Sequence, residues 1–369
     1  MRFIDACNRR PVDKTPVWFM RQAGRSLPEY RRLRESNDIL QAIKNPEIAY
    51  EITMQPVRRH KVDAAILFSD IIVPLAALDP TMTIVPGKGP VISKPFRSSS
   101  DLSRLRQLEP TEDIPYVIET VKELAKSPVP LIGFAGAPFT LASYLIEGGP
   151  SRDHRNTKAL MAQDPVLFEK LLDILAGITL TFLKTQIDAG AQAIQLFDSW
   201  VGTLSEYHYR KHILRTTQAI LGAIEVPTIH YSLGTSHLLS AIVETQPSVL
   251  SLDWRVPLLR TRSDFGDRFA IQGNLDPTIL LAPSQIINKE VNRTLEEAGT
   301  APGYIFNLGH GVLPETDPQV LTNIVEWVHE YGLSGDSLSG DSLSGDSLSG
   351  DSLSGESSSP VPSGCSDGS

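Results

Sequence analysis

Residues 16–25 have the sequence PVWFMRQAGR, an apolar run that ends abruptly in two arginines on a glycine-containing loop. A short continuous apolar run is typical of a strand that is buried on both faces. Arg21 and Arg25 then stand at the end of that strand, where their permanently charged guanidinium groups suit carboxylates. The segment predicts either a cleft for a substrate with several carboxylates or a surface loop whose arginines pair with Glu29 or Glu35.

Seven further apolar runs of similar length follow, and helical patterns separate them. One helix is marked at both ends, because Asp164 and Pro165 form a cap with a first-turn proline and Gly190 lies just beyond its apolar positions. Eight continuous apolar strands that alternate with helices predict an α/β fold, the TIM-type (β/α)8 barrel. The expected strands are residues 17–20, 64–68, 130–134, 193–197, 228–231, 249–252, 269–272 and 304–307.

The composition is typical of an enzyme that stays in the cytoplasm. The chain has 369 residues, of which 41% are hydrophobic, and no apolar run approaches the roughly 20 residues that a membrane span needs. Its two cysteines, Cys7 and Cys365, lie near opposite ends of the chain, which is not the pattern of a disulfide framework. The first residues have neither a secretory nor a transit composition. We therefore expect a cytoplasmic protein that is not exported.

The last part of the chain has a different composition. Residues 334–369 contain repeated LSGDS units and then a Ser/Pro/Gly-rich end, with six acids and no Lys or Arg. This composition predicts a disordered tail, and a calcium-binding β-roll is the weaker alternative because the period is five and double glycines are missing. Residues 1–333 form the expected barrel domain. The tail accounts for six of the nine units of net negative charge, and the remaining −3 argues against a nucleic-acid partner.

Polar residues follow every expected strand, at the ends where the active sites of this fold lie. This rim predicts a catalytic site at the barrel mouth. Besides the two arginines, the rim includes Ser69 and Asp70, Thr140 and Tyr144, Asp198 to Trp200, His230 and Ser232, Asp253 to Arg255, Gly273 and Asn274, and Gly309 to Gly311.

Several short motifs that lie in order along the chain carry a family resemblance. They are MRQAGR with LPE (residues 20–29), FSDI (68–71), GAPFT with Tyr144 and EGG (136–149), FDSW (197–200), LDW (252–254), QGNLDP (272–277) and NLGHG (307–311). Each motif alone is weakly specific. In this order, and at the ends of the expected strands, they resemble the uroporphyrinogen decarboxylase family over nearly all of the expected folded part.

The resemblance implies a substrate and a reaction. Members of the family remove CO2 from the four acetate side chains of uroporphyrinogen, which become methyl groups in coproporphyrinogen, during heme and chlorophyll biosynthesis. It implies no cofactor, a small-molecule substrate and a homodimer in the cytoplasm. The positions that match the substrate site of the family are Arg21, Gln22, Arg25, Asp70, Tyr144, Ser199 and His310.

The chemistry of this reaction suggests roles for two of these residues. An acetate on a pyrrole loses CO2 only when the ring is protonated, so the protein must stabilise a transient cation. Asp70 can accept hydrogen bonds from pyrrole N–H groups, although an Asp after a strand also often caps the following helix. Arg21 suits electrostatic stabilisation and positioning first, and proton donation only second, because arginine is a poor general acid near neutral pH.

The other matched residues have both functional and structural interpretations. Tyr144 and His310 could donate hydrogen bonds to carboxylates, and His310 could carry charge near pH 6.5, although it could also be a packed histidine. For Ser199, a hydroxyl that binds backbone is at least as good an interpretation as a ligand contact. Ser26 stands where the family usually has Tyr, and with Glu29 it matches a helix-capping pattern.

Two other functions remain as alternatives. The first is a zinc-dependent methyltransferase of the related barrel group, which needs thiolate ligands for zinc. This chain has His230, Tyr231 and Ser232 where those enzymes have His-x-Cys, so metal binding is not expected. The second is a protein that binds tetrapyrroles without catalysis, which would suit a site lacking Asp70 or the arginines.

Overall fold

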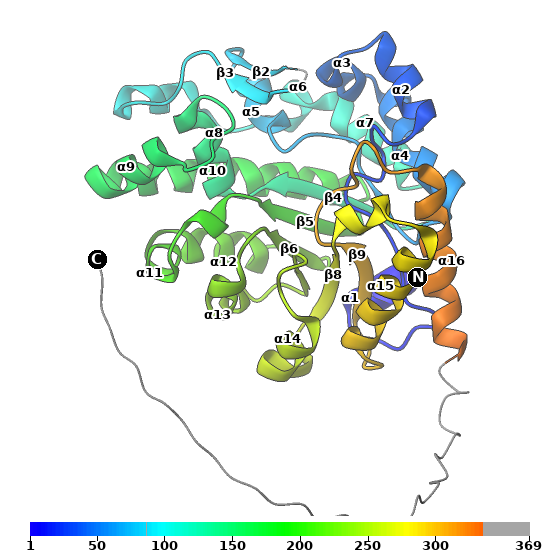
Figure 1. Cartoon of the computed structure of the whole chain (residues 1–369). Coiled ribbons are helices and arrows are strands. Elements are labelled where there is room, and N and C mark those ends of the chain that lie inside the picture. Colours follow the sequence, from blue (N-terminus) through cyan, green and yellow to red (C-terminus); the bar gives the residue numbers. More distant parts are fainter. Residues whose placement is uncertain (86, 335–369) are drawn as a thin grey trace, which may run out of the picture. The chain divides into compact units, whose positions relative to one another are not determined.

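A curled sheet of seven parallel strands forms the centre of the molecule (Figure 1). The computed structural model describes residues 1–85 and 87–334, so the expectation of a disordered tail in 334–369 lies almost entirely outside the described residues. Neighbouring strands in space are also neighbours along the chain. Their order is β1 (Ala65–Ile66), β4 (Leu131–Gly136), β5 (Ala193–Asp198), β6 (Thr228–Ser232), β7 (Val249–Ser251), β8 (Ala270–Leu275) and β9 (Tyr304–Leu308).

The segment around Val17 closes this sheet into a barrel. Val17 forms a parallel bridge with Phe306 of β9, and the Phe306 amide donates to the Pro16 carbonyl at 2.9 Å. On the other side, the Asp63 amide donates to the Val17 carbonyl at 2.8 Å, just before β1. The predicted barrel is therefore confirmed, with Val17 in the place of an eighth strand.

The predicted strand 17–20 is shorter than expected because side chains replace the ladder after Val17. The Met20 amide donates to Asn307 Oδ1 at 3.1 Å, and the Phe19 amide donates to Gln22 Oε1 at 3.0 Å. The backbone thus leaves the barrel wall while its amides remain hydrogen-bonded. The other seven predicted strands are confirmed, each within a few residues.

A small antiparallel hairpin was not predicted. It consists of β2 (Met82–Val85) and β3 (Gly89–Ile92), and Figure 1 shows it apart from the barrel sheet, beside α5 (Val73–Leu78) and α8 (Pro138–Glu147). Its strands are short, and the glycines and prolines within and between them are typical of a loop. This hairpin is an addition to the barrel near its mouth.

Helices surround the barrel, and the longest confirms a sequence prediction. The Asp164 side chain accepts from the Leu167 amide at 3.0 Å and caps α10 (Pro165–Asp188), whose apolar face is buried. The other helices are α1 (Arg2–Cys7), α2 (Pro28–Glu35), α3 (Ile39–Lys44), α4 (Pro46–His60), α6 (Pro110–Asp113), α7 (Pro115–Leu124), α9 (Arg155–Gln163), α11 (Glu206–His208), α12 (Leu214–Gly222), α13 (Leu239–Ile242), α14 (Leu258–Phe265), α15 (Ser284–Ala298) and α16 (Pro318–Ser334).

The interior of the barrel contains a buried hydrogen-bonded chain of polar side chains. Trp18 Nε1 donates to Gln272 Oε1 at 2.8 Å, and Gln272 Nε2 donates to Gln195 Oε1 at 3.0 Å and Ser251 Oγ at 2.8 Å. All four side chains are buried, so these bonds offset the cost of removing their polar groups from water. They connect the Val17 segment with β5, β7 and β8.

The Asp63 carboxylate connects the two ends of the barrel domain. Its Oδ1 accepts from Arg2 Nη1 of α1 at 2.6 Å, and its Oδ2 accepts from the Val17 amide and from His329 Nε2 of α16, both at 2.8 Å. Only 10% of this side chain is exposed, so water could not easily replace these hydrogen-bond partners if they were removed.

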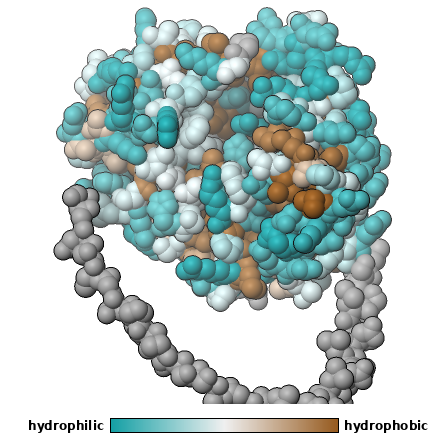
Figure 2. Space-filling view, viewed as in Figure 1, coloured by the Kyte–Doolittle hydropathy of each residue, from teal (hydrophilic) through white to brown (hydrophobic). Residues whose placement is uncertain are grey.

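Polar side chains cover most of the face seen in Figure 2, and apolar patches lie between them. In the part of the chain that the structure describes, no helix combines the length and the hydropathy that crossing a membrane would require.

Replacement of Asp63 by Asn should lower the free energy of unfolding by about 3 kcal/mol, because it removes a nearly buried charge and places an amide donor beside Arg2 or His329. Urea unfolding measures this loss. Asp13→Asn is the matched control, since Asp13 also pairs with Arg2 but is 66% exposed and should cost less than about 1 kcal/mol. Equal losses in the two variants would contradict the role of Asp63.

Candidate active site

Arg21 reaches the barrel mouth from a strained turn. Its φ of 61° lies in the left-handed region, which non-glycine residues seldom adopt. The next residue holds this turn, because Gln22 is fully buried, accepts from the Phe19 amide and donates to the Ala64 carbonyl at 3.1 Å. The Arg21 side chain lies directly on Gly311, where a Cβ atom would collide with its Cδ and Cγ.

The charge of Arg21 acts on several predicted site residues at once. It lowers the pKa values of His310 and Tyr144, and it opposes the burial that raises the pKa of Asp70. These effects fall off with distance, so the guanidinium group lies near all three side chains. Arg21, Asp70, Tyr144 and His310 follow the carboxyl ends of strands and feel the same positive charge. Their joint role in one site stays a prediction.

Asp70 has one oxygen in a turn and the other without a protein partner. Its Oδ1 accepts from the Ile72 amide at 3.0 Å, and this turn leads into α5. Within the described residues, Oδ2 has no hydrogen bond. Burial raises the pKa of this carboxyl, while the Ile72 amide and Arg21 oppose that rise. The structural alternative, a cap of the following helix, is wrong, because Ile72 is the N-cap residue of α5 and Asp70 binds only the turn before it. Oδ2 is left for a functional role.

Tyr144 and Ser199 lie on neighbouring elements of the rim. Tyr144 is on α8, and its ring packs edge-on against Trp200 with centroids 6.0 Å apart. Burial, and secondly the charge of Asp70, raise the pKa of Tyr144 to about 12, so its phenol remains a hydrogen-bond donor at neutral pH. Ser199 is half-buried, and its hydroxyl forms no hydrogen bond with another described residue.

His310 is neutral at physiological pH, contrary to the possibility of a charged histidine. Burial lowers its pKa to about 4, and the nearby charges of Arg21 and Arg255 add to this effect. Its Nδ1 accepts from the Gly311 amide at 2.7 Å. Nδ1 is therefore unprotonated and Nε2 carries the hydrogen, so His310 can donate one neutral hydrogen bond.

A row of aromatic rings leads from β4 across the barrel to His310. The Phe134 and Phe197 centroids are 5.4 Å apart, those of Phe197 and Tyr231 are 5.6 Å apart, and those of Tyr231 and His310 are 6.4 Å apart. All three pairs meet edge to face. The half-buried Phe197 thus offers an apolar surface beside the charged groups. The regular spacing of strand residues could have indicated this row, but the sequence analysis did not include it.

Arg25 lines a pocket that contains none of the other predicted site residues. It is exposed, the volume of this pocket is about 480 Å³, and Glu29 pairs with Arg59 instead, at 2.7 Å. The predicted cap by Ser26 and Glu29 is wrong, because Leu27 is the N-cap residue of α2 and the Ser26 hydroxyl is buried without a partner. The other residues that line the pocket are Tyr30, Arg31, Arg34, Glu35 and Pro314.

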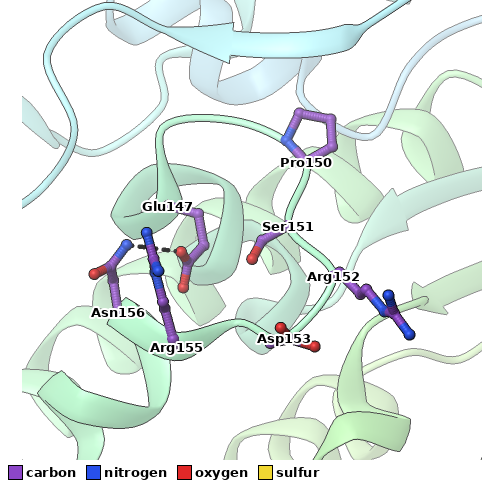
Figure 3. Close-up of a pocket in the computed structure, with 7 residues that line it drawn as sticks. All are labelled: Glu147, Pro150, Ser151, Arg152, Asp153, Arg155 and Asn156. Atoms are coloured by element: carbon purple, nitrogen blue, oxygen red, sulfur yellow. Dashed lines mark hydrogen bonds between the residues drawn. The ribbon is translucent and has the colours of Figure 1, made fainter.

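A second pocket, of about 290 Å³, lies at the start of α9 (Figure 3). Glu147 lines this pocket. Its carboxylate accepts hydrogen bonds from Asn156 Nδ2 at 2.9 Å and from the amide and hydroxyl of Thr157 at 2.8 and 2.9 Å. This carboxylate therefore caps the first turn of α9. None of the predicted site residues lines this pocket.

Asp198 is a buried acid that the sequence analysis placed on the rim but not in the site. Its Oδ1 accepts from Thr140 Oγ1 at 3.0 Å, and Oδ2 is buried without a partner. Burial raises its pKa to about 7. Because Thr140 Oγ1 also accepts from the Trp200 amide at 3.3 Å, Asp198 supports the segment that carries Ser199 and Trp200.

The residues that the structure describes contain no group of three or more His, Cys, Asp or Glu side chains arranged to bind a metal. Cys7 is buried in α1, away from the rim residues on the strand ends. The ligand set that a zinc-dependent methyltransferase needs is thus not assembled in the described part of the chain.

The sequence is similar to one well-defined family. A family model described as "Uroporphyrinogen decarboxylase (URO-D)" matches residues 1–331. A protein from Salinispora tropica named uroporphyrinogen decarboxylase is 56% identical over 333 residues, with 89% of this chain and 90% of that protein covered. A protein of the same name from Streptomyces coelicolor is 54% identical over 332 residues and covers 89% and 93% of the two chains.

Solved structures with a similar fold are more distant. A "methyltransferase from Methanosarcina mazei" superposes with a TM-score of 0.74 at 21% identity, covering 89% of this chain and 98% of that one. A putative vitamin-B12-independent methionine synthase from Listeria monocytogenes has a TM-score of 0.52 at 11% identity, covering 88% and 97%. At these identities the likeness shows the fold alone.

The raised pKa of Asp198 predicts a pH-dependent stability. An acid whose pKa is raised in the folded state gives its full stabilisation of the fold below its unfolded pKa of about 3.9. This stabilisation is lost as pH rises toward about 7. Asp198→Asn imitates the protonated acid. Between pH 5 and pH 8 the variant should gain about 3 kcal/mol in unfolding free energy relative to the unsubstituted protein, as urea denaturation measures.

The exposed Asp188→Asn is the control, and it should leave the difference between the two pH values unchanged. Parallel stability curves for Asp198→Asn and the unsubstituted protein would show that Asp198 is ionised throughout this range.

Proposed function

Because this chain belongs to the uroporphyrinogen decarboxylase family, we propose that it converts the four acetate side chains of uroporphyrinogen to methyl groups. Coproporphyrinogen is then the product. The observation that supports this proposal is the buried Asp70 carboxyl, on which the charge of Arg21 acts and whose Oδ2 has no hydrogen bond with the described residues. A carboxylate with a free oxygen and a guanidinium whose charge acts on it suit a substrate that becomes cationic in its ring and carries carboxylates at its edge.

The reaction needs a place for the electron pair that CO2 leaves behind. Protonation of the pyrrole carbon next to the acetate-bearing carbon makes the ring an iminium-like electron sink. The bond from the acetate CH2 to its carboxylate then breaks, CO2 leaves, and an exocyclic methylene remains. Addition of a proton to the methylene carbon and loss of the ring proton restore the aromatic pyrrole with a methyl group.

Asp70 stabilises the cationic ring in this proposal. Its Oδ2 accepts hydrogen bonds from the pyrrole N–H groups while Oδ1 remains in the turn with Ile72. Hydrogen bonds to a charged group are worth roughly 1.5–3 kcal/mol. A unit charge about 4 Å away adds about 4 kcal/mol at an effective dielectric constant near 20. Since about 1.4 kcal/mol is a factor of ten in rate, this interaction accounts for several powers of ten.

Arg21 holds the reacting acetate and stabilises negative charge on it. Arginine is a poor general acid near neutral pH, because its pKa lies far above the operating range. Proton delivery by Arg21 is therefore the second choice, and it requires transfer that is coupled to the carboxylate or to a water molecule. The contact between Arg21 and Gly311 supports the positioning role, because it limits the directions in which the guanidinium can turn.

The remaining site residues bind the other carboxylates and support the loop. Tyr144 and neutral His310 act as hydrogen-bond donors, and exposed Arg25 attracts carboxylates at the rim. Gln22 acts through the backbone of the arginine loop, since both ends of its side chain already bind backbone groups. Ser199 is the weakest of the assignments, although its hydroxyl is free to contact a substrate.

We also propose that residues 1–333 are the whole catalytic unit and that the enzyme is a cytoplasmic homodimer. The family match ends at residue 331, and residues 1–333 form one compact unit, which supports the first part. The composition and the family resemblance support the second part. The methyltransferase alternative is not favoured, and a binding protein without catalysis would suit a site that lacks Asp70 or the arginines, whereas this chain has both.

Anaerobic incubation with uroporphyrinogen tests the function. Oxidation of the products to porphyrins, followed by chromatographic separation by the number of carboxylates, should show loss of four carboxylates and release of CO2. Unchanged substrate that remains bound would support a binding protein instead.

Asp70→Asn should lower kcat by at least about 1000-fold while substrate binding weakens less. The asparagine oxygen can still accept from the Ile72 amide, so the turn remains and only the charge is lost. Single-turnover rates and equilibrium binding measure the two effects. Asp164→Asn, which changes the carboxylate that caps α10, is the control and should retain full activity. Full activity of Asp70→Asn would refute the catalytic role.

Arg25→Ala should have the opposite pattern. Because Arg25 lies on the exposed rim, its loss should raise KM about tenfold and change kcat by less than about threefold. Steady-state kinetics at several substrate concentrations separate the two constants. A fall in kcat as large as that of Asp70→Asn would show that Arg25 takes part in the chemical step.

A further inference from the structure

Two segments contact the turn that carries His310, one on each side. At Gly309, a Cβ atom would collide with the backbone of Asp253 and Trp254, and at Gly311 it would collide with the Arg21 side chain. Only glycine permits both approaches. The turn therefore fixes His310 between the arginine loop on one side and the segment after β7 on the other.

Arg255 is held in place on this second segment. The centre of its guanidinium group lies 3.9 Å from the centroid of the Trp254 ring, a stacked arrangement that is typical of a cation on an aromatic face. The Arg255 Nη1 donates to Asp253 Oδ1 at a long 3.4 Å, and 51% of the Arg255 side chain is exposed. The guanidinium is thus positioned at the surface of the mouth.

The Asp253 carboxylate binds mainly backbone amides rather than the Arg255 side chain. Its Oδ2 accepts from the Gly234 amide at 2.5 Å, and its Oδ1 accepts from the Arg255 amide at 2.8 Å. The ion pair with the Arg255 side chain is therefore weak. Apart from this one contact, the guanidinium donors have no hydrogen-bond partner among the described residues.

The charge of Arg255 acts on the inner wall of the mouth. It lowers the pKa of His310 and opposes the effect of burial on Tyr231, and Arg21 acts on the same two side chains. Asp70, in contrast, responds to Arg21. Because Gly311 lies against the Arg21 side chain and Gly309 against the Trp254 backbone, the segment that carries Arg255 lies on the side of the His310 turn opposite to Arg21.

We propose that Arg255, stacked on Trp254 beside His310, forms a second carboxylate subsite that binds a propionate of the tetrapyrrole. This inference rests on the proposed function. In the proposed function, Asp70 binds the pyrrole N–H groups at the centre of the macrocycle. A group on the far side of His310 would then contact the edge of the macrocycle. A propionate fits better than the reacting acetate because the proposed function already assigns the reacting group to Arg21, whose charge acts on Asp70.

The proposed reaction leaves the propionates intact, so the subsite can be tested with both the substrate and the product. Arg255→Ala removes one charged hydrogen-bonding group from a half-exposed position, so KM for uroporphyrinogen should rise about tenfold. The inhibition constant of coproporphyrinogen should rise by the same factor, because the product keeps its propionates. A change in kcat of less than about threefold is expected.

Two further variants control for charge and structure. Arg260→Ala removes an exposed arginine of α14 that pairs with Asp264 at 3.3 Å, and it should leave both constants unchanged. Arg255→Lys keeps the charge but not the planar stacking, so its KM should lie between those of the unsubstituted enzyme and Arg255→Ala. Added salt should raise KM less steeply in Arg255→Ala than in the unsubstituted enzyme, which a purely structural role would not produce.

The outcomes separate this inference from the proposed function. If the unsubstituted enzyme turns over uroporphyrinogen and Arg255→Ala has unchanged constants, or raises KM without affecting product inhibition, the propionate subsite is refuted and the function stands. If kcat falls with an unchanged product constant, Arg255 acts on the reacting acetate, which also refutes it. If the unsubstituted enzyme fails to turn over the substrate, both proposals fail.

Discussion

The closure of the barrel at Val17 is the constraint on which the site depends. One short segment must complete the sheet between β9 and β1 and then, four residues later, present Arg21 to the mouth. It does so because Asn307 and Gln22 accept from backbone amides that no longer have a strand partner. The position of Arg21 is therefore tied to the closure of the sheet, and any slip of this segment would displace the arginine.

The mouth combines permanent charges with groups that burial keeps neutral. Arg21 and Arg255 remain cationic, while His310 is neutral and Tyr144 keeps its proton. Asp198 titrates near pH 7 although Asp70 is the acid beside the arginine. Such a set of residues suits several carboxylates and still leaves one Asp70 oxygen for a cation.

The strands and the convergence of their ends were predictable, since apolar runs and the end of a parallel strand are properties of sequence order. The β2–β3 hairpin was not, because its glycines and prolines are typical of loops. The charge state of His310 depends on burial and on two arginines from distant segments, which no local pattern contains. The same limit applies to Ser26, because the pattern of a cap does not reveal that Glu29 pairs with Arg59.

The carboxylate of Asp63 joins residues that are more than 320 positions apart, since Arg2 and His329 both bind it. The two ends of the domain are thus neighbours in space. A peptide of modest length could connect them, and the chain could then begin and end in a surface loop instead. Circular permutation would preserve every strand contact of the barrel, so the order of folding could be altered without changing the final architecture.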